Sequence, residues 1–443
     1  MSWVRVGIFA GLRFTGEGVI YGFFSFSIIN IAISIKFLQH QKKRMKKIVL
    51  PVVLFFVAAF FTLQDVAAQT DSVAAFKTYR IGIFAPLYLD SVFTEDNKFR
   101  YKQGMPRFIV PGVDFINGAQ IALDSIKLQQ QNVAGFIYDT KSYKETVAQL
   151  IRSKKLDSLH LVIGSVKDLE YKQLADFALA KNIPFISATY PNDGGITANP
   201  SLVLVNSTLK AHCEAIYSYI LQNHGTGRIL LIRKKGAQED KVAAYFKAIN
   251  EPDRKPLINI QVINIDSSFS SDILKKKIDS TKQTVIIGAS LDENFATTLT
   301  SACYDLHQAY PIILIGMPNW DGFKSLVKKD QFENFPVYFT TPYFNYKWDD
   351  YSKVLTTGYA KKYKGKPSDM VFKGFEATYL FTRLLTMHPT DMMGHINDKN
   401  LKLFSDYNFR PVMLKKENTM PDYFENKHLY FIKIMNGVTT KAW

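Results

Sequence analysis

The chain has 443 residues, of which 47% are hydrophobic and 14% are aromatic, and its formal net charge is +16. These proportions are typical of a packed globular protein and exclude a disordered chain, and the length leaves room for two domains. A strong positive charge can indicate nucleic-acid binding. We exclude that class because no predicted helix carries a basic stripe with interleaved aromatic residues.

An export signal is predicted at residues 45–68. Lys46 and Lys47 supply a basic start, residues 48–63 an apolar run, and Val66-Ala67-Ala68 the small residues that a signal peptidase requires. An uncut membrane anchor, the alternative, would require about 20 apolar residues and no small-residue exit. We therefore expect cleavage after Ala68. Because no cysteine lies nearby to accept a lipid, the product should be soluble, in the periplasm or outside the cell.

Residues 1–44 are open to two interpretations. Residues 18–35 are apolar and could form an extra membrane segment, or the true start is Met45 and residues 1–44 are an upstream misreading. Two apolar segments separated only by a basic cluster favour the misreading. Residues 1–68 carry eight basic and two acidic side chains, so the mature part keeps a charge of +10. A basic exported domain suits an anionic envelope surface or an acidic partner.

Short apolar runs alternate with helical patterns from Tyr79 onwards, which is typical of βαβ units and a parallel sheet. The first strand is predicted at Tyr79–Ala85. Residues 86–112 are irregular and unusually long for a connection, and such loops are often functional. This loop could form a lid, with Phe93 or Tyr101 entering a cleft. Asp114 is then expected to cap a helix.

Two successive α/β sets of similar size follow from the pattern of apolar runs. In the first set, strands are predicted at 136–138, 159–163 and 183–187, and helices at 145–156 and 169–181. After Pro200 the order restarts, with strands at 202–205, 229–232, 258–265, 285–287 and 312–315 and helices at 208–221, 240–250 and 293–306. The fold class is therefore α/β.

The last third adds helices and then strands to these two sets. A strand is predicted at 337–341, helices at 350–363 and 370–385, and strand-like runs at 409–414 and 429–434, the last closed by the turn Asn436-Gly437. Such a tail would complete both lobes, so the chain should cross between them more than once. We assign residues 77–206 and about 342–400 to lobe one, and residues 207–341 and about 401–443 to lobe two.

Two segments carry a resemblance to a known family. Residues 136–189 contain a strand ending in Asp139, the turn Gly164-Ser165 and the strand end IPFISAT, and residues 359–385 contain Phe375-Glu376-Ala377. This order resembles the type I periplasmic solute-binding proteins, the group that includes branched-chain amino acid receptors, over essentially all of residues 77–437. The resemblance implies two Rossmann-like lobes with parallel central sheets, joined by a three-strand hinge.

The ends of the predicted strands supply candidate ligand-binding residues, because ligands of open parallel sheets meet the carboxyl ends of the strands. In lobe one these are Ser165, Ser187, Ala188 and Thr189. The Ser165 hydroxyl could receive a carboxylate at a helix N-terminus, or it could simply cap that helix. The resemblance implies that these turns hold the carboxylate of an amino acid ligand.

Further candidates come from lobe two and from the tail. Glu376 lies in an apolar helix and needs a partner, either a ligand ammonium or an Arg or Lys across the lobe. Lobe two offers Gln238, Asp292, Asn319 and Trp320, and both Trp320 and Tyr343 could wall an apolar ligand or could simply be buried. The chain departs from the family in lacking a Gly-rich turn after the first strand and in having Glu376 where Asp is common, so the identity of the ligand is not carried over.

Catalytic, cofactor and metal sites are not expected. The first strand has no Gly-rich turn after it, and the chain has no phosphate-binding loop. Four of its eight histidines, His160, His212, His224 and His307, are scattered without metal-ligand spacing. Cys213 and Cys303 make no disulfide framework, and we expect two buried thiols, although export permits a bond.

The function predicted from the sequence is that of a solute-binding protein. We expect a monomer that captures a small molecule by closing about its hinge, and that delivers it to an ABC-type membrane permease. An amino acid or a related metabolite is the first guess for the ligand. The alternative is an envelope sensor or interaction protein that uses the same fold without transport.

Overall fold

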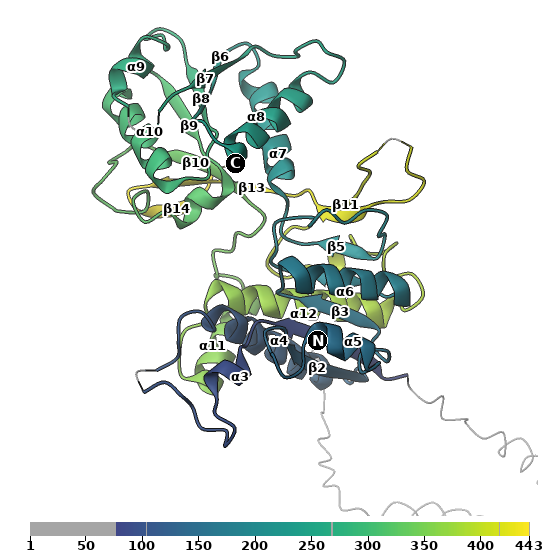
Figure 1. The fold of residues 1–443 in the computed structure, drawn as a ribbon. Coiled ribbons are helices and arrows are strands. Elements are labelled where there is room, and N and C mark those ends of the chain that lie inside the picture. The colour runs from purple at the N-terminus through teal and green to yellow at the C-terminus, as the bar shows by residue number, and fades with distance from the viewer. Residues whose placement is uncertain (1–76, 103, 267–268, 416, 443) are drawn as a thin grey trace, which may run out of the picture. The chain divides into compact units, whose positions relative to one another are not determined.

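The computed structural model describes residues 77–442 except 103, 267–268 and 416 (Figure 1). The predicted export signal at 45–68 and the segment before it lie outside the described residues. The described chain forms two seven-stranded sheets, each with helices packed against it, which confirms the α/β fold class and the two lobes.

The first sheet has the strand order β11-β12-β5-β4-β3-β1-β2. Six of its strands run parallel, and β11 runs antiparallel to β12. The bounds of its strands are β1 (Tyr79–Ala85), β2 (Val133–Asp139), β3 (Leu161–Gly164), β4 (Phe185–Ser187), β5 (Leu202–Leu204), β11 (Phe409–Val412) and β12 (Tyr423–Asn426). The helices of this lobe are α3 (Leu89–Val92), α4 (Val110–Leu128), α5 (Val147–Arg152), α6 (Asp168–Lys181), α11 (Asp350–Tyr363), α12 (Asp369–Met387) and η2 (Lys399–Leu401).

The second sheet has the strand order β14-β13-β10-β9-β8-β6-β7, with β13 and β14 antiparallel to their neighbours. Its strands are β6 (Arg228–Arg233), β7 (Ile260–Asn264), β8 (Thr284–Gly288), β9 (Ile312–Ile315), β10 (Val337–Thr341), β13 (Tyr430–Met435) and β14 (Val438–Lys441). The helices are α7 (Leu209–His224), α8 (Ala237–Asn250), α9 (Ser271–Lys275), α10 (Glu293–Leu306) and η1 (Pro318–Gly322). The predicted turn Asn436-Gly437 closes the β13–β14 hairpin with positive φ at both residues.

The chain passes between the two sheets three times, after β5, after β10 and after β12. The first and third crossings are bonded to each other, because the Ser207 hydroxyl donates to the Asn426 carbonyl (2.6 Å) and the Asn426 amide donates to the Val205 carbonyl (3.4 Å). Three crossings agree with the prediction that the chain passes between the lobes more than once, and their number is the one that the family resemblance implies for a hinge.

The assignment of residues 401–426 to lobe two was wrong. β12 pairs in parallel with β5 of the first sheet, and β11 pairs with β12. Tyr423 and Asn426 are buried there. β12 has the sequence YFEN, whose two polar residues hide its strand character, and its burial depends on partners more than two hundred residues away.

Helix α4 begins at Val110 rather than after Asp114, so the predicted cap was wrong. Pro111 occupies the first turn, where its missing N–H costs nothing. The Asp114 carboxylate instead accepts hydrogen bonds from the hydroxyls of Ser368 (2.6 Å) and Tyr359 (3.3 Å). It therefore joins α4 to the last two long helices.

The closest helix contact of the first lobe is between α4 and α12 (Figure 1). A Cβ atom added to Gly118 would lie 2.0 Å from the Val371 carbonyl oxygen, and one added to Gly374 would lie 2.0 Å from the Phe115 carbonyl oxygen. The two helices therefore meet backbone to backbone. Their apolar faces cover one side of the first sheet and α6 covers the other, while the second lobe has a hydrophobic core of its own.

Cys213 and Cys303 are free thiols buried in the core of the second lobe, as the sequence predicted. None of the helices in the described part of the chain is long and apolar enough to cross a membrane.

Candidate functional site

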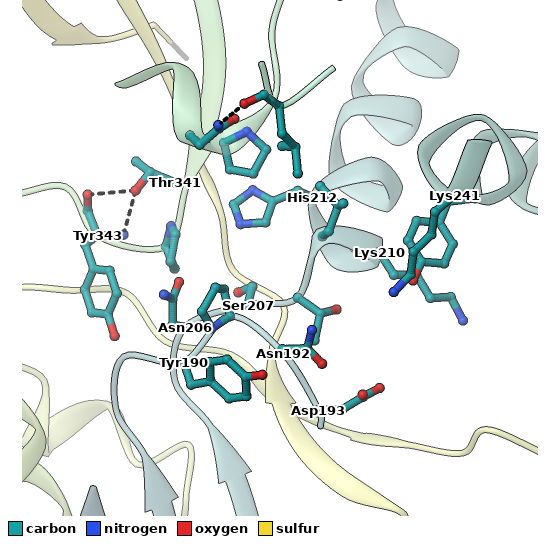
Figure 2. Close-up of a pocket in the computed structure, with 18 of the residues that line it drawn as sticks. Tyr190, Asn192, Asp193, Asn206, Ser207, Lys210, His212, Lys241, Thr341 and Tyr343 are labelled. Atoms are coloured by element: carbon teal, nitrogen blue, oxygen red, sulfur yellow. Dashed lines mark hydrogen bonds between the residues drawn. The ribbon is translucent and has the colours of Figure 1, made fainter. Parts of the chain in front are cut away.

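A cavity of about 610 Å³ lies where strands of both sheets end (Figure 2). The first lobe contributes the segment after β4 (Tyr190, Pro191, Asn192, Asp193), Asn206 after β5, and Lys373 of α12. The second lobe contributes Lys210 and His212 of α7, Gln238, Lys241 and Tyr245 of α8, and Pro318, Asn319 and Asp321 of η1. Thr341, Pro342 and Tyr343 come from the second crossing. Carboxyl ends of parallel strands are the usual place for a ligand in such sheets.

The turn after β4 is held in place by its own polar groups. Asn192 and Asp193 accept hydrogen bonds from the N–H groups of Gly194 (2.8 Å) and Gly195 (2.9 Å). The Tyr423 hydroxyl donates to the Asp193 carboxylate at 3.2 Å. Gly194 has φ +63°, and a Cβ there would lie 2.7 Å from the Tyr171 ring, so only glycine fits. This wall of the cavity is therefore preformed.

Tyr343 links the second crossing to the first lobe. Its hydroxyl donates a hydrogen bond to the Ala188 carbonyl oxygen. The Lys373 ammonium lies 4.3 Å from the centroid of the Tyr343 ring, within the range of a cation–π interaction. Burial raises the pKa of Tyr343 well above its ordinary value, so this phenol stays protonated and remains a donor.

His212 forms a buried, neutral part of the cavity wall. Its Nδ1 atom lies 2.7 Å from the Thr340 hydroxyl, and burial lowers the pKa of its ring to about 3. At neutral pH it therefore offers a ligand no positive charge. Lys210 and Lys241 stand on the other side of His212 from Tyr343 (Figure 2).

Of the predicted ligand-binding residues, Gln238 and Tyr343 line the cavity. Ser165, Ala188 and Thr189 lie together, but behind the lining. The Ser165 and Thr189 hydroxyls are 3.0 Å apart and bonded to each other, and the Thr189 carbonyl accepts a hydrogen bond from Asn206 (2.7 Å). The polar groups of this strand edge are therefore largely satisfied within the chain.

Two further predicted residues, Ser187 and Asp292, do not line the cavity. Ser187 is fully buried, and its hydroxyl has no hydrogen-bond partner among the described residues. Asp292 caps α10 by accepting from the Phe295 N–H (2.8 Å), and it pairs with Lys234 at 3.0 Å.

Trp320 is fully buried beneath the cavity rather than in its wall, as the alternative for this residue allowed. Its indole N–H donates to the Ser290 carbonyl at 2.9 Å. Its ring lies against Gly288 and Gly316, where an added Cβ would come within 2.5 and 2.2 Å of ring atoms. Asn319, from the same short helix, does line the cavity.

Glu376 finds its partner in the chain itself. Its carboxylate accepts from the N–H groups of Phe404 (2.9 Å) and Ser405 (2.7 Å) and from the hydroxyls of Ser405 (2.9 Å) and Tyr407 (2.8 Å). Burial raises the pKa of this carboxyl. The partner is thus neither a ligand ammonium nor the Arg or Lys that we considered, and the contact anchors the segment after α12.

The loop at residues 86–112 does not reach the cavity lining. The Asp139 carboxylate accepts hydrogen bonds from the N–H groups of Leu87, Tyr88 and Leu89 at 2.7–3.1 Å and so fixes the start of the loop. Phe93 and Tyr101 both contact the ring of Phe99. Their predicted entry into a cleft does not occur in this structure.

Sequence reasoning missed Asn206, Asp321 and Lys373 as lining residues. Lys373 had a readable signal, because it interrupts the apolar run of α12 between Phe372 and Gly374, both buried. Asn206 and Asp321 follow strand ends but resemble ordinary loop residues. In the described part of the chain, no group of three or more His, Cys, Asp or Glu side chains could hold a metal ion.

Comparison with known proteins gives a family and a fold. The model of a family described as periplasmic binding protein matches residues 110–391. No curated protein sequence matches the chain.

Three solved structures share the fold. A protein assigned as a branched-chain amino acid ABC transporter from Rhodospirillum rubrum has a TM-score of 0.58 at 13% identity, covering 83% of this chain and 100% of that one. A branched chain amino acid ABC transporter periplasmic ligand-binding protein from Burkholderia xenovorans has a TM-score of 0.54 at 12% identity. The match covers 83% of this chain and 95% of that one. An ABC transporter substrate-binding protein from Desulfitobacterium hafniense has a TM-score of 0.53 at 11% identity. The match covers 83% of this chain and 100% of that one.

Proposed function

We propose, from the premise that this chain belongs to the periplasmic binding protein family, that it captures a small solute between its lobes and delivers it to an ABC-type permease. The observation that carries this proposal is the cavity of about 610 Å³ at the strand ends of both sheets, with lining residues from each lobe and from the second crossing. A solute that contacts both walls stabilises the arrangement in which those walls are close.

Capture proceeds by hinge closure about the three crossings. In the proposed closed state, Asn206 and Tyr343 contact the solute from the side of the first lobe, and Gln238 and Asn319 from the side of the second. Ala188 and Thr189 act from behind by holding Tyr343 and Asn206 in place through their carbonyl oxygens, and Ser165 and Ser187 support this strand edge. Lobe one consists of residues 77–206 and about 342–426, and lobe two of the remainder of the mature chain.

The proposed site of action is the periplasm, reached through the predicted signal at residues 45–68. Two of the structural neighbours are described in terms of branched-chain amino acids. An amino acid or a related metabolite is therefore the first class to test on this chain, with the protein acting as a monomer.

A thermal-shift screen of the purified exported protein tests the proposal. A solute present at 100 times its dissociation constant adds about 2.7 kcal/mol to the free energy of unfolding, so the melting temperature should rise. Gln238→Trp should abolish the shift by filling the cavity. Lys247→Trp, an exposed position of the same helix outside the lining, is the matched control and should keep it.

If no metabolite in a broad panel shifts melting, the transport proposal fails. Recovery of specific envelope proteins with the chain would then favour the sensor or interaction role. Binding that survives Gln238→Trp unchanged would place the site elsewhere on the molecule.

A further inference from the structure

Lys373 is a half-buried cation with an incomplete set of partners. It lies on α12 next to buried Phe372, and its ammonium faces the Tyr343 ring at 4.3 Å. Of the residues that the structure describes, none places a carboxylate within 4.0 Å of the ammonium, and none accepts a hydrogen bond from it. Burial lowers the pKa of Lys373, with Asp321 and Asp369 opposing that shift only from longer range.

An ammonium taken out of water without a hydrogen-bonding partner is unfavourable, and the ring of Tyr343 compensates for only part of the lost hydration. Lys373 also borders a second cavity of about 460 Å³, whose lining shares Asp321, Thr341 and Tyr343 with the first. A negatively charged oxygen of a ligand would give the Lys373 ammonium the hydrogen-bond acceptor that it lacks. Such a charge-assisted hydrogen bond is stronger than a neutral one, and more so away from bulk water.

The other charged residues that line the cavity also favour a negatively charged ligand. Lys210 and Lys241 add two cations, of which Lys210 also pairs with Glu214 at 4.0 Å, whereas the lining acids are Asp193 and Asp321. Asp193 is already engaged by Tyr423 and by the Gly195 N–H. Glu376, the acid that the sequence offered to a ligand ammonium, is saturated by four donors from residues 404–407. The three lysines that line the cavity therefore outnumber its two lining acids.

We propose that the solute is a net anion and that Lys373 binds its carboxylate or phosphate group against the face of Tyr343. This proposal rests on the solute-binding function proposed above and names the chemical class of its ligand. A neutral amino acid would bring an ammonium into a cavity whose three lining lysines already outnumber its two lining acids, Asp193 and Asp321.

Calorimetric titration with two panels tests the inference. The anionic panel contains succinate, citrate, glycerol phosphate and inorganic phosphate, and the neutral panel contains leucine, alanine and glucose. We expect binding only by compounds of the anionic panel. Comparison of its carboxylates with its phosphates shows which of the two groups is recognised. Lys373→Gln should weaken that binding tenfold or more, because a hydrogen bond to a charged group is lost. Lys373→Arg should recover most of it.

The Asp321→Asn variant distinguishes an anionic solute from a zwitterionic one. For an anion, removal of this nearby negative charge should tighten binding, whereas for a zwitterion it should weaken binding through loss of the ammonium partner. Lys361→Gln, an exposed lysine on α11 outside both cavities, controls for the change in net charge and should bind like the parent. Circular dichroism of each variant shows whether the fold is kept.

The outcomes separate the two proposals. Binding of leucine or alanine that Asp321→Asn weakens and Lys373→Gln leaves intact overturns the anionic class but keeps the solute-binding function. Absence of binding from both panels and from the wider metabolite screen overturns the function and the inference together.

Discussion

The hydroxyl of Tyr343 donates a hydrogen bond to the carbonyl oxygen of Ala188, and this bond joins the segment that leaves β10 to the turn that follows β4. The two residues are 155 positions apart and follow strands of different sheets. This carbonyl belongs to one of the turns that the family resemblance assigned to a ligand carboxylate, and Tyr343 of the chain itself occupies it. The position of the second crossing is tied to the first lobe at this point.

Tyr343→Phe should lower the free energy of unfolding by about 1–3 kcal/mol, because the buried Ala188 carbonyl loses its donor. Urea unfolding followed by fluorescence measures the change. Tyr351→Phe removes a hydroxyl from an exposed ring and should change stability by less than about 0.5 kcal/mol. Equal effects from the two substitutions would mean that the Tyr343 bond contributes nothing.

Gly118→Ala and Gly374→Ala should each destabilise the protein by at least about 2–3 kcal/mol, because the new methyl group meets a backbone carbonyl of the facing helix. Thermal unfolding of the purified variants measures this loss. Gly358→Ala is the matched control, since that glycine lies within α11 with open space around its Cβ position. It should gain up to about 1 kcal/mol from helix propensity. A loss at Gly358 similar to that at Gly118 would contradict the steric explanation.

His212 should make stability depend on pH below neutrality. Its pKa is about 3 in the folded chain and 6.5 when unfolded, so from pH 6.5 downwards the unfolded state binds a proton that the folded state refuses. Stability therefore falls as the pH falls through this window, by about 3 kcal/mol between pH 6.5 and 4 from this residue alone. Denaturant unfolding at a series of pH values measures it.

The informative quantity is the difference in pH slope between the parent and His212→Gln. The variant loses the contact with Thr340 at every pH, but it has no proton to gain, so its stability should fall less steeply from pH 6.5 to 4. Parallel slopes would show that His212 titrates normally in the folded protein.

Lys427→Met should lower the free energy of unfolding by about 3 kcal/mol or more, because it leaves a buried carboxylate at the hinge without its partner. The Lys427 ammonium lies 2.6 Å from Glu425, which is buried, and 2.9 Å from Glu214 of α7. Removing one member of a buried ion pair leaves an uncompensated charge. Lys353→Met breaks an exposed pair with Asp350 and should have almost no effect. The double variant Glu425→Gln with Lys427→Met should regain part of the loss, and its failure to do so would assign the cost to packing.

Much of the fold was predictable where an apolar run is bounded by clear end signals. The predicted bounds of β1, β9, β10, α10 and α11 agree with the structure residue for residue. The last two begin after Asp292 and Asp349, whose side chains accept a backbone N–H of the first turn. Local chemistry decides where such helices begin, and the sequence therefore contains enough information to place their starts.

Elements whose burial depends on distant partners were not predictable. β14 has the sequence VTTK and is largely exposed, and β12 depends on β5 for its place. The same applies to the site. The sequence indicated the strand edge that carries Ser165 and Thr189, but nothing in it showed that Tyr343 and Asn206 would cover that edge. Gly288 and Gly316 were the readable signs that Trp320 would be buried, since two glycines leave a space that a large ring can fill.

The return of β12 to the first sheet has a consequence for how the protein is made. Synthesis delivers β5 more than two hundred residues before β12, and α12 comes more than two hundred residues after α4. Until then, the first sheet keeps an unpaired edge at β5, and α4 lacks the helix against which it is fitted. The lobe that begins first thus cannot finish until residue 426 has emerged. Folding of this lobe should therefore be held back until nearly the whole chain has been synthesised.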